Sequence, residues 1–175
     1  MNETIKKEIE KRYFDILQNL YLSWKLNLKD NKEKLVLSET GIRYIYDLIE
    51  KLVYQTIENL DKMFEDIKSE FKVKIPLKYL KQCLEKSTKS IYNYIDEMEK
   101  EILNQYNKVL DIESNNCKIN NLKGNVKSKL ERIYDKNKNL EEFKRIEWLV
   151  IINTIATIGG FIVSIISLVI TLSID

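Results

Sequence analysis

The sequence predicts an all-α protein: an antiparallel bundle of about four long helices, the last of which continues into a single C-terminal transmembrane helix. Three observations predict this fold. Apolar residues recur every three or four positions through most of residues 1–147, which is the period of an amphipathic helix. The chain holds only 4 glycines and 1 proline, so it has few residues suited to sheet turns. The segment from Trp148 to Ile174 contains no charged side chain.

The first two helices follow from two apolar stripes separated by a polar break. A helix is expected from about residue 3 to 28, with the stripe Ile5, Ile9, Tyr13, Ile16, Leu17, Leu20 and Trp24. The polar run 29–33 should end it. Ser38 suits the N-cap of the second helix, because its hydroxyl can accept a hydrogen bond from a free backbone N–H. That helix should end near Phe71, and its stripe is Ile42, Ile45, Ile49, Leu52, Thr56, Leu60, Met63 and Ile67.

Pro76 predicts a turn before the third helix, because a proline disfavours helical geometry at the residue before it. The third stripe should end near Glu113; it consists of Leu77, Leu80, Leu84, Ser87, Ile91, Ile95, Met98, Ile102, Tyr106 and Val109. The asparagine-rich stretch 114–121 predicts a loop. A fourth stripe comprises Leu122, Val126, Leu130, Ile133, Leu140 and Phe143. The polar run 135–139 lacks glycine and proline, so the last helix can continue through it, although a break there is the alternative.

The apolar segment predicts a single membrane span. Its 27 residues extend roughly 40 Å as a helix, and a hydrocarbon core needs only about 30 Å. Basic residues precede the span and only Asp175 follows it, which places residues 1–147 in the cytoplasm by the positive-inside rule. Lys144, Arg145 and Trp148 are the expected anchors at the membrane interface. We therefore expect a cytoplasmic helical bundle over residues 1–147 and a transmembrane helix over residues 148–175 of a single-pass cell-membrane protein.

Composition argues against several classes of function. The chain has no histidine, and its glycines are too scattered to form a phosphate-binding loop, so we expect no enzyme activity, no metal site and no cofactor. The net charge of +2 arises from 29 basic and 27 acidic residues, and such a balance does not suggest a nucleic-acid partner. Cys83 lies among apolar residues at helical spacing and is expected to be a small core residue.

The most specific pattern is a seam of small and polar residues inside the predicted span. Its members are spaced 4, 3, 4, 3 and 4 positions apart: Asn153, Thr157, Gly160, Ser164, Ser167 and Thr171. Lipid cannot hydrogen-bond their side chains, so the seam favours contact with another copy of the chain. In one interpretation Ala156, Gly160 and Ser164 pack a tight dimer. In the other, several copies surround a water-filled pore with a ring of Asn153 at its cytoplasmic end. Serine and threonine can also bond to their own helix, which would make the seam tolerable without a function.

The layout of a helical body and a minimal membrane part is similar to that of small membrane effectors of bacterial antiviral and abortive-infection systems. The resemblance covers the layout alone and includes no shared motif. Together with the seam, it suggests a homo-oligomer that forms an ion-conducting or depolarising pore. Because the last body helix is expected to continue into the span, the cytoplasmic domain is expected to gate this pore. The alternative is a tail-anchored scaffold protein that recruits a partner to the membrane. The expected partners are the lipid bilayer, further copies of the chain and a cytoplasmic signal or protein.

Overall fold

The computed structural model describes residues 1–31, 39–106 and 112–174, and within these it describes the side chains of 1–27, 41, 43–104 and 118–165. The described part is made of four helices and contains no strand: α1 (Glu3–Asn31), α2 (Glu39–Phe71), α3 (Leu77–Tyr106) and α4 (Ile112–Ile174). The chain divides into two compact units, Met1–Tyr134 and Asp135–Asp175. The predicted all-α class is confirmed. The functional division at residue 147 remains a prediction.

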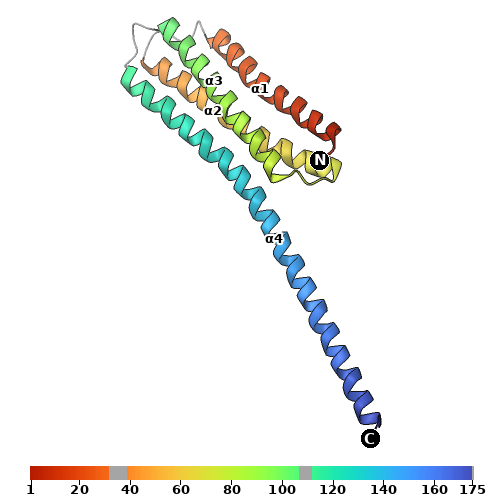
Figure 1. Cartoon of the computed structure of the whole chain (residues 1–175). Helices are drawn as coiled ribbons and strands as arrows, with labels where there is room; N and C mark the ends of the chain where they lie inside the picture. The colour runs from red at the N-terminus through yellow and green to blue at the C-terminus, as the bar shows by residue number, and fades with distance from the viewer. Residues whose placement is uncertain (32–38, 107–111, 175) are drawn as a thin grey trace. The chain divides into compact units, whose positions relative to one another are not determined.

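The helices of the first unit alternate in direction, as predicted for an antiparallel bundle (Figure 1). Arg12, early in α1, bonds to Glu70 at the end of α2, so these two helices are antiparallel. The rings of Tyr21 in α1 and Tyr94 in α3 contact each other in a tilted arrangement, with centroids 5.8 Å apart. Further along both helices, the Trp24 indole N–H donates to Glu101 at 2.8 Å, so α1 and α3 are parallel.

The core of the first unit is built from the predicted stripes. Each stripe presents one face to the others, which removes its apolar side chains from water. The least exposed large side chains, all under 2 % exposed, are Trp24, Phe64, Ile9, Ile45, Ile49, Leu60, Ile67, Leu80, Ile91, Ile95, Met98 and Ile102. Phe64 lies beside the predicted stripe and was not assigned to it. Cys83 is partly buried and packs against this core.

The turn between α2 and α3 lies where Pro76 predicted it. Lys72 adopts a left-handed conformation (φ 49°), and the N–H of Val73 donates to the carbonyl of Lys68 at 3.3 Å. This pattern closes a helix C-terminus, normally with glycine at the left-handed position. The carbonyl of Pro76 then accepts the N–H groups of Tyr79 and Leu80, at 2.9 and 3.0 Å, and starts α3.

The loop predicted over residues 114–121 is wrong. The described part of α3 reaches Tyr106, and α4 is already helical from Ile112, so Glu113 and the stretch 114–121 belong to the last helix. Asparagine costs at most about 0.7 kcal/mol relative to alanine inside a helix. Burial of Ile119 and Leu122, at 3 % and 6 % exposed, outweighs that cost. The helix expected to end near residue 28 also continues to Asn31. The predicted cap at Ser38 lies outside the described residues.

The polar run 135–139 is helical, so the expected continuation of the last helix is confirmed and the alternative break is not present. Asn137, in the apolar stripe position of that run, is 5 % exposed. The next two members of the predicted stripe are not buried: Leu140 is 49 % and Phe143 is 61 % exposed. Burial of the stripe therefore ends before the uncharged segment begins.

Candidate functional site

The candidate site is the uncharged part of α4. Among the described helices, α4 is the one long and apolar enough to cross a membrane. Large apolar side chains along it are open to the surroundings, for example Trp148 at 65 %, Ile155 at 65 % and Phe161 at 68 % exposed. None of the apolar window of α4 is buried within the protein. A contiguous exposed apolar surface of this kind is typical of a site that contacts lipid or another protein segment.

The structure brings the first four seam residues onto an exposed part of one helix. Asn153, Thr157, Gly160 and Ser164 are all exposed. The helix continues past Ser167 and Thr171 to Ile174. The side chains of these two residues lie outside the described part, so their role in the seam remains a prediction. Lys144, Arg145 and Trp148, the predicted interface anchors, are exposed on the same helix.

Two seam hydroxyls already have hydrogen-bond acceptors in their own helix. Thr157 Oγ1 donates to the carbonyl of Asn153 at 2.8 Å, and Ser164 Oγ donates to the carbonyl of Gly160 at 2.9 Å. Such bonds to the carbonyl four residues earlier satisfy the donor without a partner chain. Thr154, which lies beside the seam, makes the same bond to Val150.

Asn153 differs from these hydroxyl residues. Its side-chain amide makes no hydrogen bond to any residue in the described part of the chain. An amide has two donor hydrogens and an acceptor oxygen, so it can both give and receive a bond from an identical amide. Two or more copies of Asn153 facing one another can therefore satisfy groups that a single helix leaves open.

Gly159 and Gly160 leave the helix surface bare near the middle of the segment. A Cβ built at either position would meet no atom within 4 Å. Small residues let two helix backbones approach closely, and Gly160 and Ser164 are four positions apart. Another helix backbone can therefore approach closely at Gly160.

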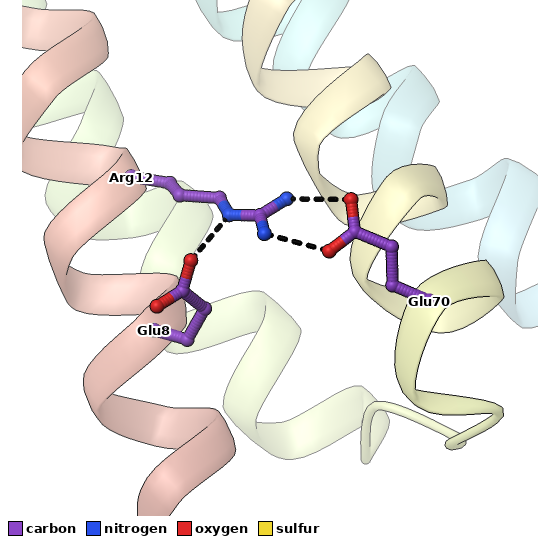
Figure 2. Close-up of polar contacts among 3 residues, drawn as sticks. All are labelled: Glu8, Arg12 and Glu70. Carbon is purple, nitrogen blue, oxygen red and sulfur yellow. Dashed lines mark hydrogen bonds and ion pairs between the residues drawn. The ribbon is translucent and has the colours of Figure 1, made fainter.

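The body of the protein carries a polar cluster on its surface, formed by Arg12 (Figure 2). The guanidinium donates to Glu8 at 2.7 Å within α1 and to both carboxylate oxygens of Glu70 in α2, at 3.1 and 2.6 Å. The hydrogen bond from Arg12 holds the pKa of Glu70 below its ordinary value. A bidentate arginine–carboxylate pair fixes the relative position of two helices. We assign this cluster to the stability of the bundle.

The first part of α4 is bound to α2 and α3 by hydrogen bonds and an ion pair between polar side chains, in addition to its buried apolar residues. Lys123 pairs with Asp96 of α3, and its carbonyl accepts the Tyr92 hydroxyl at 2.8 Å. On the other side, the Asn125 amide donates to the Tyr54 hydroxyl of α2 at 3.1 Å. The periodic stripes gave no signal for these contacts, because each partner lies on the polar edge of its helix.

Tyr46 is buried with an unsatisfied polar atom. The residue is 5 % exposed, and its hydroxyl has no hydrogen-bond partner in the described part of the chain. Burial, together with the negative charge of Glu99, raises the pKa of Tyr46 to about 12. The pKa of Glu99 is itself raised, chiefly by burial. The ring of Tyr46 lies 5.8 Å from the Lys118 ammonium of α4.

Two further searches, one for metal-binding groups among the described residues and one for similar known proteins, gave no match. Among the described residues, no group of three or more metal-ligating side chains lies together. No protein-family model, no curated protein and no solved structure matched this chain. The site must therefore be interpreted from its own residues.

Proposed function

We propose that this chain is a single-pass membrane protein whose copies assemble through the seam of α4 and form an ion-conducting or depolarising pore. Residues 148–174 cross the bilayer, and the helical body lies in the cytoplasm. Lys144, Arg145 and Trp148 hold the cytoplasmic end of the span at the membrane interface. The partners of the protein are lipid and further copies of itself.

The observation that carries this proposal is the exposed Asn153 amide, which has no partner in the described part of the chain. A polar group left unsatisfied in hydrocarbon costs roughly several kcal/mol. The described part of the chain contains one candidate span, so we expect water or the Asn153 of another copy to supply the missing partner. A ring of these amides supplies both, because it pairs neighbouring helices and lines an aqueous path.

Gating by the body follows from the length of α4. One helix runs from Ile112 to Ile174, and its first part packs in the bundle through Ile119, Leu122 and Val126. A helix resists bending more than a loop does. A shift of the bundle helices against α4 would therefore be transmitted to the seam.

The biological setting we propose is bacterial antiviral defence. This part of the proposal is supported only by the layout shared with small antiviral membrane effectors, a helical sensor and a minimal membrane part. In that setting a cytoplasmic signal or protein triggers the body, and the pore dissipates the membrane potential.

A scaffold function is the second candidate, and one observation favours it. Thr157 and Ser164 donate to carbonyls of their own helix, so these hydroxyls need no water-filled lumen. In a scaffold, Gly160 and Ser164 would pack a dimer, and the body would recruit a cytoplasmic partner to the membrane.

A membrane-potential dye in cells that express the full chain tests between these functions. Wild type is expected to depolarise the membrane when triggered or overproduced. Asn153→Leu and Ser164→Leu should restore the potential, because they make the proposed lumen apolar. Thr154→Leu is the matched control, since Thr154 bonds to its own helix but lies off the seam. Equal potential in cells with wild type and with an empty vector, with and without phage challenge, would favour the scaffold.

Gating is tested separately by inserting two glycines after Glu147. Glycine weakens a helix by roughly 1 kcal/mol per residue relative to alanine, so the insertion creates a flexible joint before the span. The expected result is a pore that no longer responds to its trigger. An unchanged response would refute transmission through α4 while leaving the pore itself untouched.

A further inference from the structure

The first unit contains a cleft between α3 and the part of α4 that packs in the bundle. Its volume is about 590 Å³. Sites for small molecules commonly measure roughly 300–1,000 Å³ and present an apolar lining with a few polar groups. The cleft lies in the cytoplasmic body and uses no residue of the proposed seam.

The floor of the cleft is formed mainly by carbon atoms. Leu84 and Leu130, at 5 % and 2 % exposed, line it from the two helices, together with Tyr92 and Tyr134. Two polar groups of this wall are used elsewhere. The Tyr92 hydroxyl donates to the backbone of α4 at 2.8 Å, and Thr88 Oγ1 donates to the carbonyl of Leu84 at 2.9 Å. A ligand that covers the floor therefore needs an apolar surface.

Most charged groups at the edge of the cleft are paired. The Lys81 ammonium is 4.0 Å from Glu85, and the Lys127 ammonium is 4.0 Å from Glu131. These are exposed pairs between residues four apart on one helix.

Asp96, also in the lining, is neutralised by Lys123. Lys89 lines the same cleft and makes no ion pair with any carboxylate in the described part of the chain. Counted together with Lys123, which pairs with Asp96 from outside the lining, the groups around the cleft carry four positive and three negative charges, and the surplus positive charge lies at Lys89.

We propose that this cleft binds a single-chain fatty acid, with its hydrocarbon chain over the floor and its carboxylate against Lys89. A neutral hydrocarbon would leave the surplus charge unpaired. A ligand with several negative charges would meet Glu85, Asp96 and Glu131 around the same opening. One apolar chain with one carboxylate matches both the floor and the charge. This site stands apart from the proposed pore and does not depend on it.

The test uses the full-length protein in phosphatidylcholine nanodiscs and dodecanoic acid that carries a photoreactive diazirine. After irradiation, labelled peptides are mapped by mass spectrometry. Labelling is expected within residues 81–96 or 127–134, with competition by dodecanoate and much weaker competition by dodecanol. Labelling confined to residues 148–174, or equal competition by the alcohol, would overturn the proposal.

Two variants test where the carboxylate and the hydrocarbon chain of the fatty acid bind. Lys89→Ala should reduce labelling of the cleft about fivefold, which corresponds to the loss of one surface ion pair. Lys86→Ala is the matched control, because Lys86 is exposed on the same helix and does not line the cleft. Thr88→Trp should block labelling by filling the cleft, and helicity by circular dichroism confirms that each variant is folded. Undiminished labelling of folded Lys89→Ala would reject the carboxylate contact, and undiminished labelling of folded Thr88→Trp would reject the cleft.

Discussion

Replacing Asn153 by leucine should weaken the association of full-length chains in lipid more than removing a hydroxyl of the seam. The hydrogen bonds in the structure explain why the effect of Asn153→Leu should be the larger one. The Asn153 amide has no partner in the described part of the chain, whereas the Thr157 hydroxyl donates to the carbonyl of Asn153 at 2.8 Å. Among the seam residues whose side chains are described, Asn153 is the one whose donor groups a second helix or water must satisfy.

The expected size follows from hydrogen bonds between membrane helices, which contribute about 0.6 kcal/mol on average and up to about 2 kcal/mol. Loss of one such bond raises the dissociation constant about threefold to thirtyfold. Thr157→Val removes a bond within the helix, so it should change the dissociation constant less than about twofold. Thr154→Val, off the seam, provides the same chemical change as a control.

Association is measured by energy transfer between donor- and acceptor-labelled chains in vesicles over a range of protein-to-lipid ratios. Comparing dissociation constants for Asn153→Leu, Thr157→Val and Thr154→Val gives the order directly. An unchanged constant for Asn153→Leu would refute the reasoning. An equal loss for Thr157→Val would show that the hydroxyl leaves its own helix to bond across the interface.

Three further predictions concern the stability of the body. Lys72→Gly should raise the free energy of unfolding by up to about 1 kcal/mol in urea titrations, because glycine accepts the left-handed φ of 49° without strain. Arg12→Met should lower stability above pH 4.5, and the difference from wild type should shrink as the pH falls below 4.5. The hydrogen bond from Arg12 lowers the pKa of Glu70 from 4.5, so its contribution is present above that pH and is lost as the carboxylate protonates. Tyr46→Phe should stabilise the protein by about 1–3 kcal/mol, because it removes a buried hydroxyl without a partner in the described residues. The same variant should also show a smaller decline in stability between pH 10 and 12, because Tyr46 no longer contributes to the loss that arises when unfolded tyrosines ionise first.

Each of these predictions has an outcome that contradicts it. A lower free energy of unfolding for Lys72→Gly would mean that the lysine side chain, not its backbone, matters at the turn. A pH-independent difference between wild type and Arg12→Met would remove Glu70 as the titrating partner. Destabilisation by Tyr46→Phe would indicate that the hydroxyl is hydrogen-bonded. Tyr44→Phe, at a side chain 51 % exposed, is the control for that change.

The wrong prediction of a loop over residues 114–121 shows that local residue preferences do not always predict secondary structure. Residues 114–121 contain four asparagines, which predicted a loop between the third and fourth helices. Propensity is a weak preference, and burial of the apolar residues that follow overrides it. The turn at Pro76 was predicted correctly because proline acts sterically on its immediate neighbour. Ring geometry and the absence of an N–H do not depend on distant contacts.

Some features of the candidate site could be predicted from the sequence, and others became visible only in the structure. Spacing alone predicted the seam residues, and the structure shows that they lie on one helix that runs as far as Ile174. The contrast within the seam came from the structure, since it depends on which hydroxyl rotamer reaches a carbonyl four residues back. The α3–α4 cleft and the surplus charge at Lys89 had no signal in the sequence.

The amino-acid sequence by itself determined the all-helical class, the turn at Pro76, the single uncharged segment and the spacing of the seam residues. Each of these is a property of residues within a few turns of one another, and helix formation is governed by that local range. Only the tertiary structure decided that Arg12 reaches Glu70, 58 positions away, and that Tyr46 is buried. The cleft between α3 and α4 was likewise decided only by the tertiary structure. Such contacts depend on the register in which separate helices pack, and many registers satisfy the same apolar stripes until side-chain shape and charge select one.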